Sequence, residues 1–198
     1  MIGRLTGKLV LKQPPLLVLD VGGVGYEVEA PMSTFYKLPA LGETVTLQTH
    51  LTVREDAHLL FGFGSSVEKA LFRELIKISG VGPKLALSLL SGISVEDFWS
   101  TVRAGEVARL TKVPGVGKKT AERLVVEMRD KAGGGDAGSF GLPGAVTAET
   151  GSPLQEAKAA LVALGYKPAE IQRFTDAVHK DGMSTEQIIQ EALRRAVR

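Results

Sequence analysis

The chain has 198 residues, a hydrophobic fraction of 44%, no cysteine and a formal net charge of +2. This length suits one to three small domains, each with a real core. The apolar runs are far too short to span a bilayer. The absence of cysteine excludes disulfides and thiolate metal sites. The first residues lack the apolar segment of a signal peptide, so we expect a cytoplasmic protein.

Residues 1–63 have the pattern of a small β domain. Hydrophobic and polar side chains alternate along residues 44–53 and along residues 26–30, which is the period of half-buried strands. Five strands, with a short helix near residues 32–38, predict a closed barrel. We favour an OB-like barrel, although the pattern also fits an SH3-like one. Turn signals separate the strands at residues 13–15, 20–25 and 54–57.

Two acidic residues, Glu55 and Asp56, lie at the tip of the hairpin expected between Val53 and Leu59. Acidic residues are common in solvated turns, so their chemistry alone assigns no function. Two adjacent side chains without a third acid also make a poor Mg²⁺ site. We therefore expect neither a metal nor a cofactor here. The histidines lie in separate segments and form no metal set: His50, His58 and His179.

A motif occurs twice within residues 64–131, with a period of 35 residues. Residues 78–89 read Ile-Ser-Gly-Val-Gly-Pro-Lys-Leu-Ala-Leu-Ser-Leu, and residues 113–124 read Val-Pro-Gly-Val-Gly-Lys-Lys-Thr-Ala-Glu-Arg-Leu. Apolar residues at helical spacing surround each Gly-Val-Gly, which predicts a helix, a tight turn and a second helix. Between the two copies, Ser94 followed by Asp97 has the spacing of a capping box and predicts the start of a linking helix.

Each repeated turn has the features of an anion site. Glycine permits positive φ and close approach of a ligand, and Pro83 suits the first position of the following helix. Amides at a helix N-terminus attract phosphate, and Lys84, Lys118 and Lys119 add charge. Residues 68–131 carry 12 basic and 8 acidic residues, so the positive charge of the chain collects here. The second turn lacks the first glycine of a P-loop, so no nucleotide site is predicted.

Residues 132–152 are rich in glycine and lack helical periodicity. Such a segment cannot bury a core. We therefore expect a flexible linker between the repeat and the last part of the chain.

Residues 153–198 predict a module of three helices. The first would bury one apolar face that includes Leu161 and Leu164, and it would end at Gly165. Pro168 and Ser184 would start the other two. The module has no basic excess and no catalytic set, and it is too small to be very stable alone. A small tethered module of this kind suggests a partner-binding domain.

The repeated turns resemble the helix-hairpin-helix family, whose members hold the DNA backbone without reading bases. The order of barrel, tandem hairpins, Gly-rich linker and three-helix module covers the whole chain and resembles the bacterial RuvA family, which binds Holliday junctions. Residues 1–7, 79–84 and 114–124 carry the resemblance, and the linker and last module match less specifically. The predicted class is thus a multidomain α+β protein with boundaries at 1–63, 64–131, 132–152 and 153–198.

The resemblance implies a homotetramer, sometimes doubled to an octamer, on a square-planar four-way junction, with Glu55 and Asp56 as an acidic pin at its centre. It implies that the last module recruits a RuvB-type hexameric ATPase for branch migration in recombination and repair, through exposed members of Leu161, Leu164 and Tyr166. A junction-resolving nuclease is a further implied partner. The implied DNA contacts are Gly80, Val81, Gly82, Lys84, Gly115, Val116, Gly117, Lys118, Lys119 and Arg123.

Two other classes of function fit parts of this pattern. Helix-hairpin-helix motifs also occur in glycosylases and nucleases, but Glu122, Glu127 and Asp130 lead straight into the linker, so no catalytic pocket follows. We therefore expect no enzyme activity in this chain. A generic DNA-tethering adaptor stays open, because phosphate contacts alone confer no preference for a junction.

Overall fold

The computed structural model describes residues 1–132, 152–166, 168–178 and 182–196. The chain divides into two compact units, Met1–Gly141 and Leu142–Arg198. Residues 133–151 of the expected linker lie outside the described residues. Val197 and His179 also lie outside them. No helix in the described segments is both long enough and apolar enough to cross a bilayer.

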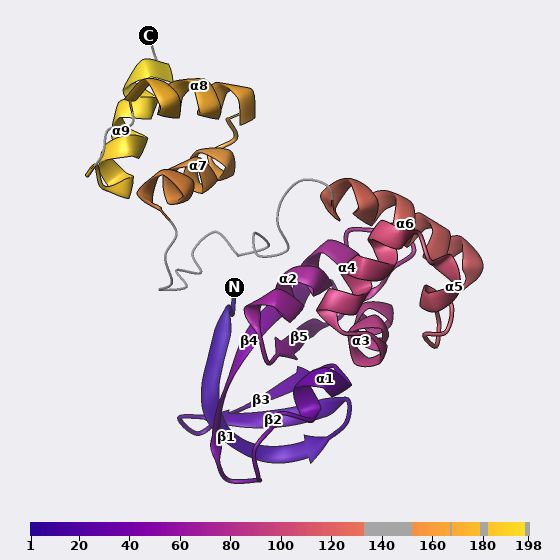
Figure 1. The fold of residues 1–198 in the computed structure, drawn as a ribbon. Helices are drawn as coiled ribbons and strands as arrows, with labels where there is room; N and C mark the ends of the chain where they lie inside the picture. The colour runs from indigo at the N-terminus through magenta and orange to yellow at the C-terminus, as the bar shows by residue number, and fades with distance from the viewer. Residues whose placement is uncertain (133–151, 167, 179–181, 197–198) are drawn as a thin grey trace. The chain divides into compact units, whose positions relative to one another are not determined.

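Five strands form a closed barrel with the order β1-β2-β3-β5-β4 (Figure 1). All neighbouring pairs are antiparallel except β3 and β5, which run parallel at Glu29 and Phe61. This arrangement confirms the OB-like barrel. A one-turn helix, α1 (Met32–Phe35), follows β3 as expected. The strands are β1 (Arg4–Gln13), β2 (Leu16–Val21), β3 (Val24–Glu29), β4 (Thr44–Val53) and β5 (His58–Phe63).

The helical part of the first unit continues directly from the barrel. Its helices are α2 (Ser66–Leu75), α3 (Pro83–Gly92), α4 (Val95–Ala104), α5 (Val107–Leu110) and α6 (Lys118–Ala132). The Ser94 hydroxyl accepts the Asp97 amide at 3.0 Å, which confirms the predicted cap of α4. Trp99 of α4 is buried.

The barrel and the helices have separate cores, and strand β5 contributes to the core of the helices. Phe61 and Phe63 of β5 pack against Phe72 of α2, with ring centroids 5.0 and 4.9 Å apart. Both strand residues therefore belong to the helical core rather than to the barrel interior. Burial of such aromatic rings contributes strongly to packing, so β5 and α2 hold the hairpins in a fixed position relative to the barrel.

The second unit contains three described helices, α7 (Pro153–Ala163), α8 (Pro168–Val178) and α9 (Thr185–Ala196). The Ser184 hydroxyl accepts the Gln187 amide at 3.3 Å, which confirms the predicted start of α9. The core side chains come from all three helices, and they are Ala157, Leu161, Ile171, Val178, Ile188 and Ala192.

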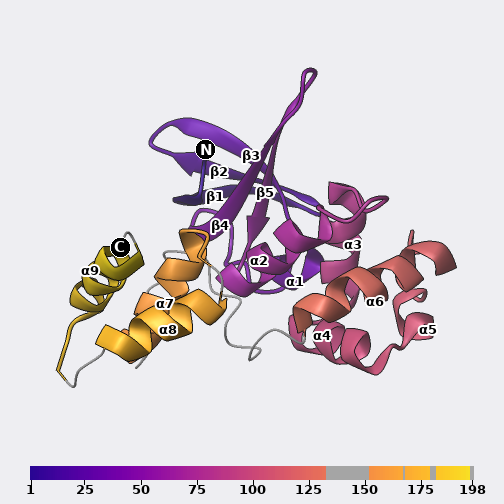
Figure 2. The same cartoon turned by 90° about the horizontal axis from the view of Figure 1, so that it is seen from above.

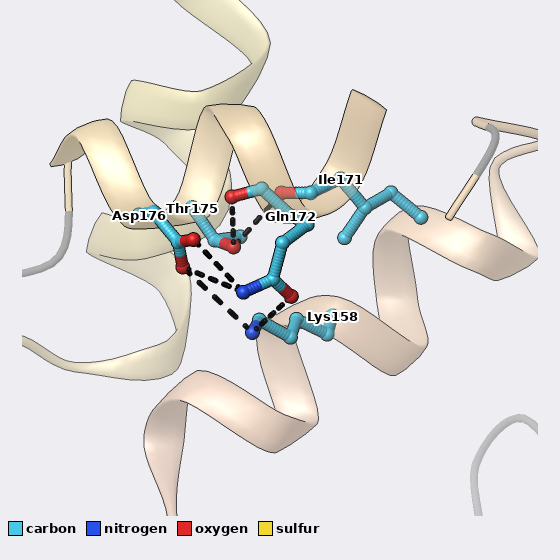
Figure 3. Close-up of polar contacts among 5 residues, drawn as sticks. All are labelled: Lys158, Ile171, Gln172, Thr175 and Asp176. Atoms are coloured by element: carbon cyan, nitrogen blue, oxygen red, sulfur yellow. Dashed lines mark hydrogen bonds and ion pairs between the residues drawn. The ribbon is translucent and has the colours of Figure 1, made fainter. Parts of the chain in front are cut away.

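A polar cluster joins α7 to α8 beside this core (Figure 3). The Lys158 ammonium donates to the Gln172 side chain at 2.9 Å and lies 4.0 Å from Asp176. The Gln172 amide in turn donates to Asp176 at 2.8 Å. The buried Thr175 hydroxyl donates to the Ile171 carbonyl at 2.8 Å, so it leaves no unpaired group in the core. Of these contacts, the two made by Lys158 link α7 to α8.

Candidate nucleic-acid interface

The first repeated turn joins α2 to α3. Gly80 has a φ of +87°, a left-handed conformation that favours glycine. The chain then enters α3 through Gly82, whose φ of −83° and ψ of 170° are extended. The Gly82 carbonyl accepts the Ala86 amide at 3.0 Å, and Pro83 occupies the first helical position as predicted.

The second turn joins α5 to α6 and repeats this geometry. Gly115 also has a φ of +87°, and the Gly117 carbonyl accepts the Ala121 amide at 2.9 Å. The two turns therefore match in backbone conformation as well as in sequence. One supersecondary unit is used twice, and each copy opens a helix toward the same kind of ligand.

The expectation for Val81 and Val116 has to be corrected. Their amides do not point outward, because each donates within its own turn, to Ile78 and Val113 respectively, at 3.0 Å. Both valine side chains are buried in the helical core. The valine in each Gly-Val-Gly therefore anchors the turn instead of contacting a phosphate.

The open donors are the glycine and first-turn amides. Within the described residues, the amides of Gly82 and Gly117 reach no hydrogen-bond acceptor. A Cβ atom added at either glycine would meet no atom within 4 Å, so both glycines border open space. The first-turn amides of α3 and α6 also lack intrahelical acceptors. Each turn thus presents several N–H groups at the positive end of a helix.

Three exposed lysines surround these amides as expected. Lys84 lies in the first turn of α3, and Lys118 and Lys119 open α6. The Lys118 ammonium is 4.0 Å from Glu122, a weak exposed ion pair that a phosphate can replace. The turns therefore combine oriented dipoles with mobile cations.

The two hairpins brace each other. The Arg123 guanidinium of α6 donates to the Ser79 carbonyl in the first turn at 2.8 Å. The first hairpin also contacts the second. The Leu85 side chain of α3 lies beside Gly115, 3.2 Å from the position that a Cβ atom would occupy there. Sequence reasoning assigned Arg123 only to DNA and missed Leu85, because neither contact is local in sequence. Arg123 also lies 3.8 Å from Glu127, so part of its charge is already compensated.

The acidic residues lie at the tip of the β4–β5 hairpin, which extends beyond the rest of the barrel (Figure 2). The Arg54 amide donates to the Ala57 carbonyl at 2.8 Å and closes the turn. Glu55 and Asp56 are exposed, and neither has a hydrogen bond or ion pair to a described residue. No cluster that could hold a metal ion occurs among the residues that the structure describes.

The proposed partner residues of the second unit differ in exposure. Leu161 is 1% exposed and belongs to the module core, so its side chain is unavailable to a partner. Leu164 was expected on the buried face, yet it is 61% exposed, because α7 ends at Ala163 and the chain turns away from the core. Tyr166 is half-buried against Phe174.

These features define a protein with an OB-like barrel and a helix-hairpin-helix tandem. Family models match in the same order: the RuvA N-terminal domain over residues 1–62, a SAM-like helix-hairpin-helix tandem over residues 72–130, and the RuvA C-terminal domain over residues 152–197. The chain belongs to the RuvA family.

Full-length relatives agree with this assignment. A protein of Thioalkalivibrio sulfidiphilus is 55% identical over 197 residues, with 98% of each chain covered. Proteins of Actinobacillus pleuropneumoniae and Pseudomonas syringae are 53% and 52% identical, again with 98% of each chain covered. All three are named Holliday junction branch migration complex subunit RuvA.

Proposed function

We propose that this protein binds four-way DNA junctions as a four-fold symmetric assembly and serves as the non-catalytic DNA-binding subunit of a branch-migration complex. The observation that carries the proposal is the pair of matching turns, which present open amides at helix N-termini beside exposed lysines. The relatives named above support the junction as substrate. A nucleoid location follows from binding DNA.

In this proposal, each subunit places both hairpins on the junction arms. Amides of Gly80, Gly82, Gly115 and Gly117 bind phosphates, and Lys84, Lys118 and Lys119 add charge. Arg123 holds the two turns together through its bond to Ser79, and its positive charge also attracts the DNA. Glu55 and Asp56 stand at the crossover, where carboxylates repel phosphates and keep the strands apart.

Assembly should dominate affinity, and the salt dependence of binding tests this. If each hairpin neutralises about two phosphates, one subunit gives a log–log salt slope near −4 and four subunits give roughly −14. We expect the steeper slope on a synthetic four-way junction. A slope near −4 for the assembled complex would contradict a four-fold complex.

Competition between the junction and linear duplex of equal total length, with Mg²⁺ and without ATP, tests substrate choice. We expect a strong preference for the junction and no cleavage. Equal binding to both DNAs would leave the hairpins as phosphate sites and replace junction recognition with a general tethering role. Metal-dependent cleavage lost on changing Glu55 would instead indicate an enzyme.

The second unit would recruit the RuvB-type ATPase through Leu164 and Tyr166. Because Leu164 is 61% exposed, Leu164→Asp should leave the module folded. The lost apolar contact should weaken binding of the ATPase by about tenfold or more in a pull-down or by interferometry. Junction binding should not change. Val162, 55% exposed on another face of α7, supplies the matched control Val162→Asp. Equal losses for both variants would argue against this surface.

A further inference from the structure

Three basic residues lie together where α2 packs on the outside of β4, and the proposed function uses none of them. Lys69 and Arg73 are one helical turn apart on α2, which packs against β4, the strand that carries His50. The His50 ring contacts Phe72 edge-on, with centroids 5.7 Å apart. The Lys69 ammonium donates to the Gly3 carbonyl at 2.9 Å, and the residue as a whole is 8% exposed.

Among the residues that the structure describes, no carboxylate balances this basic cluster (His50, Lys69 and Arg73), in which Lys69 and Arg73 carry the positive charge and His50 can gain one. Burial, then Arg73, then Lys69 lower the pKa of His50, and burial and Arg73 lower the pKa of Lys69. No carboxylate offsets either effect. Arg73 makes no hydrogen bond or ion pair with a described residue. Packing has thus collected basic groups without a carboxylate partner, an arrangement that a bound anion would stabilise.

The side chains also leave donors available. The guanidinium of Arg73 has its full set of N–H groups, and the Lys69 ammonium keeps two after its bond to Gly3. Arg73 and His50 are half-buried, so an anion can reach them from solvent while part of its surroundings excludes water. A phosphate oxygen accepts strong charge-assisted hydrogen bonds from guanidinium, ammonium and imidazolium groups.

The position of the basic cluster indicates where such a phosphate would come from. β4 continues from His50 to the acidic tip, five residues or about 16 Å away. α2 ends at Leu75, two residues after Arg73, and the chain reaches Gly80 of the first hairpin five residues later. The cluster therefore lies where β4, which leads to the acidic tip, meets α2, which leads to the first hairpin.

We propose that His50, Lys69 and Arg73 form a third phosphate site in each subunit, which holds a DNA strand between the acidic tip and the first hairpin. Arg73 and His50 contact the phosphate, and Lys69 supports it from its anchored position on Gly3. The DNA source of the phosphate rests on the proposed function, whereas binding of the anion itself does not.

The first measurement is an NMR titration of the histidine rings in the full chain, with and without inorganic phosphate at constant ionic strength. His50→Gln assigns the His50 signal. We expect phosphate to raise the pKa of His50 by about 0.5 unit or more, because an anion favours the charged ring. Arg73→Gln should abolish that rise. In phosphate-free buffer it should itself raise the pKa of His50, because a repelling charge is gone.

The second measurement is the salt slope of junction binding by the assembled protein. Arg73→Gln should reduce the slope by about 3 to 4, from the loss of one phosphate contact in each of four subunits. Lys77→Gln is the matched control, since Lys77 follows on the same segment, is 61% exposed and is paired with Glu74 at 2.5 Å. It should leave the slope unchanged.

The proposal is wrong if phosphate leaves the pKa of His50 unchanged and if Arg73→Gln and Lys77→Gln give the same salt slope of junction binding. Dissociation of the assembly by Arg73→Gln without any phosphate effect would also overturn it, and would assign the cluster to a carboxylate of a second copy. If the wild type fails to bind junctions but phosphate still shifts His50, the anion site stands and the proposed function fails.

Discussion

Valine at both Gly82 and Gly117 should abolish tight junction binding while the protein stays folded. Gly82 has a φ of −83°, which any residue adopts, and a Cβ at either position meets no neighbouring atom. Glycine at these positions serves the approach of a ligand rather than the backbone conformation. A branched side chain there would cover the open amides. Each lost charge-assisted hydrogen bond costs about 1.5–3 kcal/mol. Losing one per hairpin removes two bonds from each subunit, which alone predicts a fall in affinity of roughly a hundredfold, and the loss is larger for four subunits.

The measurement is a gel shift with the four-way junction, accompanied by thermal unfolding. Valine is a poorer N-cap than glycine, so each substitution should cost about 0.5–1 kcal/mol of stability, too little to unfold a typical domain. Gly92→Ala, at the other end of α3, is the control, because its Cβ would lie 3.5 Å from Val113 in ordinary contact. Wild-type affinity in the double valine variant would show that the turn amides do not bind phosphate.

Neutralising the acidic tip should strengthen junction binding, whereas the valine substitutions weaken it. In Glu55→Gln with Asp56→Asn, four subunits lose eight carboxylates near the crossover. A carboxylate about 10 Å from a phosphate costs roughly 0.4 kcal/mol in water, before screening. Screening reduces the total, so we expect affinity for the junction to rise about tenfold at low salt and the gain to shrink at high salt. The preference over duplex should fall, since the feature that matches the open crossover is gone.

Competition gel shifts at two salt concentrations measure both effects. The control removes the same number of charges elsewhere, in Glu27→Gln with Glu106→Gln, two exposed positions outside the tip. An equal gain in the control would mean that net charge, rather than the position of the carboxylates, sets affinity. No change in either variant would place the tip away from the DNA.

The barrel and the hairpins were predictable because their signals are local. Alternation along residues 44–53 indicated a strand with one buried face, and the structure has β4 there. Ser94 and Asp97 identified the start of α4 from a spacing of three residues. The 35-residue repeat predicted two equal turns, and Gly80 and Gly115 have the same left-handed conformation.

Errors arose where burial decided the outcome. The family resemblance implied that all three residues of each Gly-Val-Gly contact the DNA, but the apolar valine packs inward and its amide closes the turn. Helical spacing placed Leu164 with Leu161 on one face, yet the helix ends at Ala163 and only Leu161 is buried. Periodicity cannot place the end of a helix to within one residue.

The sequence by itself determined the order of the domains, the two turns and their chemistry, because turn conformation and helix starts depend on residues within a few positions of each other. Only the tertiary structure decided how these parts are held. Arg123 donates to Ser79, which is 44 residues away in the sequence. Phe61 and Phe63 belong to a barrel strand, but their side chains pack on α2. His50 of β4 likewise packs on Phe72 of α2, near Lys69 and Arg73. Packing of β4 and β5 against α2, and of the two hairpins against each other, brings these distant residues together, and no local preference encodes that packing.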